Sequence, residues 1–179
     1  MEGEKRKCWF VMRDLTRPNA KLSAYKLLTD AHLEVFTPMR WLLKVKNGRR
    51  IREKVPVIRD LLFVHDTREA IDPIVERIST IQYRFKRGGG YREPMIVADA
   101  EMERFIGAVN VSETPKYYLP GELTASMCGR DIMVVGGPLD GYKGKLLTIR
   151  GSKVKRLLVE LPEFFSVGVE VEPEYIQFI

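Results

Sequence analysis

The side chains best suited to nucleophilic or zinc chemistry in this 179-residue chain belong to two cysteines and two histidines. A cysteine nucleophile needs a histidine within hydrogen-bonding reach and a third group that orients it. Cys8 lies in a strand-like apolar run, His32 follows a helical pattern, and His65 ends a second apolar run. No spacing pairs them with each other or with Cys128, and the motifs HExxH and GxSxG are absent. The sequence therefore predicts no enzyme, no metal site, no disulfide framework and no cofactor.

A glycine-rich stretch, GGPLDGYKGK at residues 136–145, is the next feature whose composition is typical of a functional loop. A phosphate-binding P-loop needs a lysine followed by serine or threonine, and then a helix. This stretch has neither, because an apolar run resumes directly after it. Its glycines reach backbone angles that strain other residues, and its Gly-Pro and Asp-Gly pairs form turns. We therefore expect a shaped turn built by Gly136, Gly137, Pro138, Gly141, Tyr142 and Gly144.

A second glycine run, at residues 88–90, is flanked by Lys86, Arg87 and Arg92. Such a run between two strand-like segments favours a flexible loop tip. A phosphate-binding loop is the alternative interpretation.

Positive charge is concentrated in one segment of the chain. Residues 1–110 hold 22 Lys and Arg against 15 Asp and Glu, whereas residues 111–179 hold 8 against 9. Within the first part, residues 40–59 (RWLLKVKNGRRIREKVPVIR) contain eight basic residues and one acid, Glu53. Such a density attracts a polyanion in a salt-sensitive manner. The alternative is a solvated hairpin whose charges protect its edges.

The centre of this segment is Asn47-Gly48, which is the strongest short signal for a β-hairpin. The two arms of the hairpin would project together, and phosphate contact is the firmest expectation for their cations. Trp41 among them is suited to stacking on an unpaired base. The predicted nucleic-acid-binding residues are Arg40, Trp41, Lys44, Lys46, Arg49, Arg50, Arg52 and Lys54.

The elements that must position this hairpin alternate between strands and helices. CWFVM at residues 8–12 and LLFVHD at 61–66 predict strands, and IQYRFKRGGGYREPMIV predicts a strand, a loop and a strand. Apolar stripes predict helices from Ala20, within residues 67–79 and from Asp99. In the second of these, Pro73 is expected in the first turn with Asp72 as cap. The order indicates an α+β sandwich over residues 1–110.

The chain changes character around NVSETPKYYLPGE, so residues 111–119 are predicted to be a linker. Residues 120–179 show no helical stripe. They contain the short Val-, Ile- and Leu-rich runs DIMVV, KGKLLTI, RLLVEL, VGVEV and YIQFI, separated by glycines and polar residues. Five short strands in so few residues predict a small β-barrel.

No apolar stretch approaches the roughly 20 residues that a membrane helix needs. The opening residues MEGEKRKCWF lack the apolar core of a signal peptide. We expect a cytoplasmic protein with no membrane partner.

Several motifs in order resemble the NusG family of transcription factors. DIMVVGGPLDGYKGKLLTI resembles a KOW motif, and CWFVM resembles the opening strand of the family's N-terminal (NGN) domain. VPVIRDLLFV, REPMIVADAEMERFI and YLPGE resemble the buried strand after the hairpin, the strand with its acidic helix, and the entry to the KOW domain. The resemblance runs from about residue 8 to residue 179. It implies an NGN-like α/β sandwich followed by a five-stranded SH3-like KOW barrel.

The resemblance also implies a function and partners. Family members bind RNA polymerase through the NGN domain and promote processive elongation or antitermination; the hairpin would meet the non-template DNA strand, the upstream duplex or nascent RNA. The KOW domain would recruit a ribosomal protein or a termination factor. The implied polymerase-binding residues are Trp9, Phe10, Ile58, Leu61 and Phe63. For each of these, packing in the core is the alternative role.

The chain departs from the family at one motif. Arg59-Asp60-Leu61 stands where the family commonly has Pro-Gly-aromatic before the buried strand. In this respect the chain resembles the specialised UpxY-like members, which antiterminate operons for surface polysaccharides. A ribosomal or RNA-binding KOW protein without polymerase contact is the remaining functional alternative.

Overall fold

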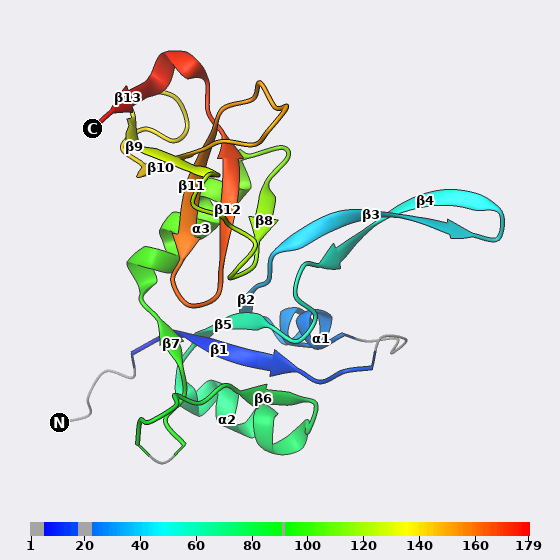
Figure 1. The fold of residues 1–179 in the computed structure, drawn as a ribbon. Helices are drawn as coiled ribbons and strands as arrows, with labels where there is room; N and C mark the ends of the chain where they lie inside the picture. Colours follow the sequence, from blue (N-terminus) through cyan, green and yellow to red (C-terminus); the bar gives the residue numbers. More distant parts are fainter. Residues whose placement is uncertain (1–5, 18–22, 91) are drawn as a thin grey trace. The chain divides into compact units, whose positions relative to one another are not determined.

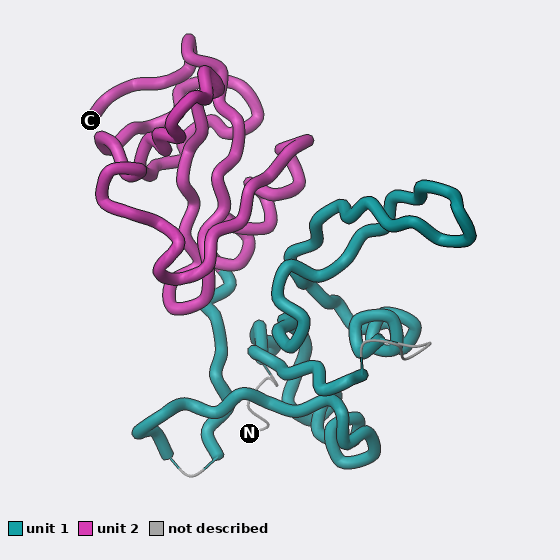
Figure 2. Tube along the Cα trace, turned by 45° about the vertical axis from the view of Figure 1, so that its right-hand side comes forward, with its two compact units in different colours: residues 1–99 teal, residues 100–179 magenta. Residues whose placement is uncertain are grey.

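The computed structural model describes residues 6–17, 23–90 and 92–179 of the chain. By packing, the chain divides into two compact units, Met1–Asp99 and Ala100–Ile179 (Figure 2). This division reports contacts alone, so the predicted domain limits at residues 110 and 119 stay a prediction. Within the described residues, no helix is both long and apolar enough to cross a membrane.

The first unit is built on a five-stranded sheet with β1 at its centre (Figure 1). The strand order is β2-β5-β1-β6, and β7 also pairs with β1; each pairing is antiparallel. The strands are β1 (Cys8–Asp14), β2 (Glu34–Phe36), β5 (Leu62–Asp66), β6 (Ile81–Tyr83) and β7 (Ile96–Val97). The predicted mixture of strands and helices is thus confirmed for this unit.

One face of this sheet is covered by α1 (Ala24–Asp30) and α2 (Arg68–Arg77). Because side chains alternate along a strand, Phe10 and Met12 of β1 point to the same side. They form a buried core with Leu62 and Val64 of β5, Ile81 and Tyr83 of β6, and Ala24, Leu28 and Ile71 of the helices. Tyr83 also donates a hydrogen bond to Asp72 of α2 (2.8 Å). Burial, together with this bond, raises the pKa of Tyr83.

The first two helices each begin at a hydroxyl cap. For α1, the cap is Ser23, whose hydroxyl accepts from the amide of Lys26; the predicted start at Ala20 lies outside the described residues. The predicted start of α2 at Asp72 is wrong. Thr67 caps this helix by accepting from the amide of Ala70, so Pro73 lies inside it. The proline removes one helical hydrogen bond, which the cap and the buried Ile71 offset.

The predicted hairpin is confirmed. β3 (Met39–Lys46) and β4 (Arg49–Pro56) form a two-stranded sheet of their own, paired over eight positions. Asn47 and Gly48 have φ of 51° and 72°. Positive φ at both central residues is what a type I′ turn requires.

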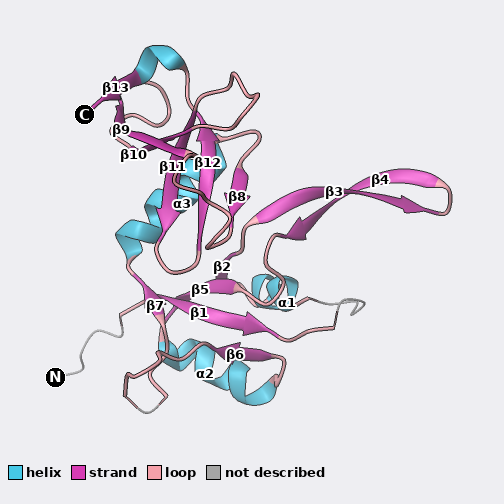
Figure 3. Ribbon diagram, viewed as in Figure 1, coloured by secondary structure: helices cyan, strands magenta, loops and turns pink. Residues whose placement is uncertain are grey.

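The second unit contains a six-stranded sheet in the order β13-β9-β10-β11-β12-β8 (Figure 3). Its strands are β8 (Lys116–Tyr118), β9 (Cys128–Val134), β10 (Lys143–Leu147), β11 (Arg156–Leu161), β12 (Phe165–Glu170) and β13 (Ile176–Phe178). A 3₁₀ turn, η1 (Pro173–Tyr175), precedes β13. The five strands predicted within residues 120–179 are present, and β8, which forms within the predicted linker, adds a sixth strand to the sheet. The pairing runs as an open path, and no closure into a barrel is seen among the described residues.

The third predicted helix is α3 (Asp99–Val111), and its start at Asp99 is confirmed. Met102, Phe105 and Ala108 are fully buried along one face. Phe105 meets the ring of Phe165 of β12 edge to face, with ring centroids 5.1 Å apart. By packing, most of α3 therefore belongs to the second unit.

Substitution of Ile71, which is fully buried in the first unit, will test this core. Ile71→Ala leaves a cavity and is expected to lower the free energy of unfolding by about 2–5 kcal/mol. Ile51→Ala, at a 38% exposed isoleucine of the hairpin, is the matched control, expected to cost less than about 1 kcal/mol. Urea denaturation of the full chain measures both. Equal losses would contradict the assignment of the core.

Candidate functional site

The β3–β4 hairpin exposes an uninterrupted stretch of chain. Every residue from 40 to 54 is exposed, including all eight predicted nucleic-acid-binding residues. Eight paired positions correspond to a ribbon roughly 25 Å long. In Figure 1 the ribbon extends away from the five-stranded sheet of the same unit. The hairpin therefore presents the predicted residues to solvent.

The register of the hairpin sorts its side chains onto two faces, because directly opposed residues share a face. The first, here called the Trp41 face, carries Trp41, Leu43 and Val45 of β3 opposite Lys54, Arg52 and Arg50 of β4. The second, here called the Lys44 face, carries Arg40, Leu42, Lys44, Lys46, Arg49, Ile51 and Glu53. The Trp41 face thus holds three cations and no acid, and the Lys44 face holds four cations and one acid.

Trp41 lies among cations. The guanidinium carbon of Arg52 is 4.8 Å from the centroid of the indole, and the Nζ of Lys54 is 5.2 Å from it. Cations at such distances are attracted to the electron-rich face of an aromatic ring. The indole is nevertheless 54% exposed. Sequence reasoning placed these residues in one hairpin; only the register shows that they share a face.

On the Lys44 face, Lys44 and Glu53 form an ion pair with Nζ and Oε2 2.6 Å apart. The hydrogen bond from Lys44, and then its charge, lowers the pKa of Glu53. Both side chains are about half exposed, so the pair adds little stability. Its consequence is local, since Glu53 neutralises one cation of this face.

The predicted polymerase-binding residues do not form one exposed patch. Trp9 (3% exposed), Leu61 (3%) and Phe63 (0%) are buried, and Ile58 is half-buried. Phe10 belongs to the core beneath the helices, where it meets the ring of Tyr83 edge to face. Trp9 and Phe63 point to the opposite side of the sheet, since they alternate with Phe10 and Leu62.

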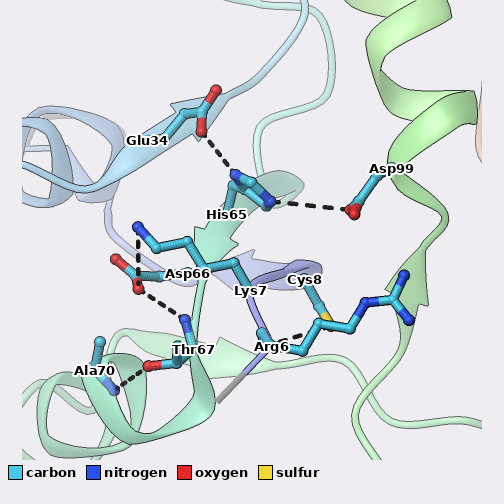
Figure 4. Close-up of polar contacts among 9 residues, drawn as sticks. All are labelled: Arg6, Lys7, Cys8, Glu34, His65, Asp66, Thr67, Ala70 and Asp99. Carbon is cyan, nitrogen blue, oxygen red and sulfur yellow. Dashed lines mark hydrogen bonds and ion pairs between the residues drawn. The ribbon is translucent and has the colours of Figure 1, made fainter. Parts of the chain in front are cut away.

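Figure 4 shows a polar cluster around His65 that sequence reasoning missed. The imidazole stacks on the indole of Trp9 with centroids 4.8 Å apart. Its Nδ1 lies 2.7 Å from Glu34 Oε2 of β2, and its Nε2 lies 3.9 Å from Asp99 Oδ1 at the start of α3. The three residues are far apart in sequence, so no motif announced them. The cluster connects two strands and a helix start.

The geometry of this cluster is that of a network of polar contacts. The thiol of the nearby Cys8 contacts the carbonyl of Arg6 at 3.9 Å, and Asp66 pairs with Lys7 at 3.8 Å. Among the described residues, no group of three or more His, Cys, Asp or Glu is placed to hold a metal ion.

At the glycine run of residues 88–90, a carboxylate of the same chain occupies the hydrogen-bond donors. Glu93 Oε2 accepts a hydrogen bond from the amide of Gly90 (3.3 Å), and Glu93 Oε1 accepts one from Lys86 Nζ (2.8 Å). These bonds, the one from Lys86 first, lower the pKa of Glu93. A carboxylate thus occupies the position where a phosphate would bind, which favours the interpretation as a loop tip.

The glycine-rich turn of the second unit joins β9 to β10. Gly136, Gly137 and Gly141 have φ of 99°, 69° and 82°, as the composition of the turn predicts. Asp140 Oδ1 accepts from the amide of Gly136 (2.6 Å) and holds the turn closed. Gly144 is required for another reason: a Cβ there would overlap the backbone carbonyl of Leu158 on β11.

Tyr142, the aromatic residue of this turn, packs against α3. Its hydroxyl donates to the backbone carbonyl of Arg104 at 3.0 Å, and the guanidinium carbon of Arg104 lies 5.8 Å from its ring centroid. A Cβ at Gly107 would come within 2.6 Å of the same hydroxyl. The turn therefore fixes the helix onto the sheet of the second unit.

Comparison with known families gives one match. A family model described as "Transcription termination factor nusG" matches residues 7–106. No curated protein sequence is significantly similar to the chain. Among solved structures, one titled "Domain interaction in Thermotoga maritima NusG" is similar over 99% of both chains, at 15% identity and a TM-score of 0.48.

Gly141 is needed for its positive φ and Gly144 for the close approach of β11, and this difference leads to a prediction for stability. Gly144→Ala forces β10 and β11 apart and is expected to cost at least about 3 kcal/mol, at the upper end for overpacking. Gly141→Ala meets no atom within 4 Å but strains a backbone with φ of 82°, so it is expected to cost about 1 kcal/mol. Thermal unfolding of the two full-length variants checks the order. A larger loss for Gly141→Ala would contradict it.

Proposed function

Because the chain belongs to the family of the transcription termination factor NusG, we propose that it is a transcription elongation and antitermination factor that binds RNA polymerase. The observation that carries this proposal is the family match over residues 7–106, which is more than half of the chain. The exposed cationic hairpin within that region supports a role beside nucleic acid. The family is one of transcription factors, so the proposal includes no catalytic step.

The polymerase contact is proposed for the side of the sheet opposite the helices. Trp9, Leu61 and Phe63 give this side the apolar and aromatic character that interface hot spots favour. Each is at most 3% exposed, so they are proposed to support the surface while Ile58 makes the contact. Ile58 is half-buried and lies between the hairpin and β5, so it is the residue of this set best suited to a test. Phe10 is assigned to the core on account of its packing.

The hairpin is proposed to contact the nucleic acid near the polymerase: the non-template strand, the upstream duplex or nascent RNA. Seven cations along one exposed ribbon, with a single acid among them, favour phosphate contact. This assignment covers Arg40, Trp41, Lys44, Lys46, Arg49, Arg50, Arg52 and Lys54.

The second unit is proposed to be a KOW domain of the SH3-like type that recruits a ribosomal protein or a termination factor. Support comes from the five predicted strands and from the glycine-rich turn at residues 136–144. Residues 111–179 carry 8 basic and 9 acidic residues, so bulk attraction to RNA is not expected of them. In sequence terms the domains are proposed to be residues 1–110 and 120–179, with 111–119 between them.

We also propose that the chain is a specialised, UpxY-like member that acts on particular operons, such as those for surface polysaccharides. The support is the replacement of the family's Pro-Gly-aromatic motif by Arg59-Asp60-Leu61. Asp60 has a structural role here, since its carboxylate pairs with Arg84 (3.3 Å) and its carbonyl accepts from the amide of Asp14 (3.2 Å). Asp60 of the replaced motif therefore contributes contacts to the fold of this chain.

Capture from a cell lysate by the tagged full chain tests the proposed function. RNA polymerase subunits are the expected product. Ribosomal particles without polymerase would instead favour a ribosomal or RNA-binding KOW protein and would overturn the proposal.

Replacing Ile58 will test the polymerase surface. Ile58→Ala removes apolar contact area and is expected to weaken polymerase capture about tenfold, because a hot-spot truncation costs about 1–2 kcal/mol or more. Ile78→Ala, at a half-buried isoleucine that packs against the helix-side core, is the matched control and should leave capture unchanged. Equal effects of the two variants, with equal melting temperatures, would refute the assignment.

Charge reversal tests the hairpin. The double change Arg49→Glu and Arg50→Glu, one residue on each face, is expected to weaken binding to a DNA duplex at least tenfold. It should also flatten the dependence of affinity on salt, because each lost phosphate contact removes about one unit of slope. A salt titration that superimposes on that of the unmodified chain would contradict the proposed contact.

A further inference from the structure

We propose that the Trp41 face of the hairpin binds an unpaired nucleic-acid strand, with a base stacked on Trp41 and phosphates held by Arg50, Arg52 and Lys54. The inference rests on the proposed nucleic-acid role of the hairpin. It specifies which face of the hairpin binds, and it specifies that the bound strand is unpaired.

The apolar residues of this face are unusual in their exposure. Trp41, Leu43 and Val45 are 54%, 61% and 72% exposed, and they follow one another at every second position of β3. Single exposed apolar residues are common on protein surfaces, whereas a contiguous exposed apolar group marks a binding surface.

The cations of the same face run beside this row. Arg50, Arg52 and Lys54 are opposed to Val45, Leu43 and Trp41, so each apolar residue has a cation across from it. Successive members of the cationic row lie about 7 Å apart along the strand. That separation is comparable with the distance between neighbouring phosphates of an extended single strand. The face thus offers one row for bases and a parallel row for phosphates.

The partner of this face is inferred from its charge and its aromatic residue together. Three cations with no acid select a polyanion. A duplex presents phosphates but keeps the faces of its bases stacked inside, so it offers nothing for the indole. An unpaired strand offers both, and stacking of bases on aromatic side chains beside cations is the usual means of binding it. Arg52 and Lys54 lie over the indole ring at 4.8 and 5.2 Å from its centroid, so the base is proposed to stack on the part of the indole that stays exposed.

The Lys44 face provides an internal comparison. It has no aromatic residue, its exposed apolar members Leu42 and Ile51 are each 38% exposed, and Glu53 neutralises Lys44. This face retains enough cations for phosphate contact with any nucleic acid. It lacks a platform for a base, so the distinction between paired and unpaired strands is assigned to the Trp41 face alone.

The test uses the full chain and three fluorescein-labelled probes: a mixed-sequence 12-nucleotide DNA, the RNA of the same sequence, and the corresponding 12-base-pair DNA duplex. Fluorescence anisotropy gives each dissociation constant. Trp41→Ala is expected to weaken binding of the single strands about tenfold, as for the loss of one stacked base, and to change duplex binding less than about twofold. The stronger of the two single-strand affinities identifies DNA or RNA as the partner.

Two matched variants control for loss of apolar area and of charge. Leu42→Ala truncates the neighbouring exposed residue on the Lys44 face and should leave all three affinities unchanged. Arg52→Gln should weaken single-strand binding more than Arg49→Gln, although both remove one exposed arginine of β4. Trp41 emission should also be quenched by the single strands, with Trp41→Ala abolishing the quenching, because Trp9 is only 3% exposed.

The outcomes separate the inference from the proposed function. If Trp41→Ala weakens duplex and single strands equally, or if Leu42→Ala has the same effect as Trp41→Ala, the stacking inference is overturned while salt-dependent binding by the hairpin stands. If the unmodified chain binds none of the three probes, both the inference and the nucleic-acid role fail, and an acidic protein becomes the partner to seek. Melting temperatures within about 2 °C of the unmodified chain confirm that the variants are folded.

Discussion

The burial of β1 on both of its faces is the constraint on which the first unit depends. This strand pairs with β5, β6 and β7, and its residues Trp9 to Met12 are each at most 7% exposed. A strand in that position must be apolar throughout, which is why CWFVM shows no alternation. Its register fixes the sheet, and the sheet fixes the base of the hairpin. There the hydroxyl of Thr37 donates to the carbonyl of Leu61 (2.9 Å), and the amide of Val57 donates to the carbonyl of Pro38 (2.8 Å).

Because its base is fixed in this way, the hairpin can use its outer residues for binding. Edge protection explains lysines and arginines on a two-stranded ribbon, since charges discourage pairing with other chains. It does not explain an exposed row of Trp41, Leu43 and Val45, which by itself would favour such pairing. Apolar and cationic rows on one face, in register, are explained by a ligand that has both an apolar surface and negative charge. The register therefore weighs more than the count of charges in assigning a function to this segment.

Local signals in the sequence were sufficient wherever one residue pair or one periodicity determines the structure. Asn47-Gly48 specified the hairpin, and the stripe containing Met102 and Phe105 specified α3. Contacts between distant segments were not predictable in this way. The cluster of His65 with Glu34 and Asp99 depends on strand pairing, and β8 is three residues long in a polar context. The preference of proline for the first turn of a helix led to the wrong predicted start of α2. That preference is weaker than the effect of the Thr67 cap and of the buried Ile71 that follows it.

The helix α3 shows why a domain defined by sequence and a unit defined by packing need not coincide. The family match ends at residue 106, within the helix, whereas the packing division falls at its start. A helical stripe predicts that one face is buried, but it carries no information on the surface against which it is buried. Here Phe105 packs on Phe165, and the backbone of Arg104 accepts from Tyr142. A fragment ending at residue 110 would separate Phe105 from this partner and expose a buried aromatic ring. Binding experiments on the first domain are therefore best interpreted in the full chain, where α3 keeps the contacts that bury its apolar face.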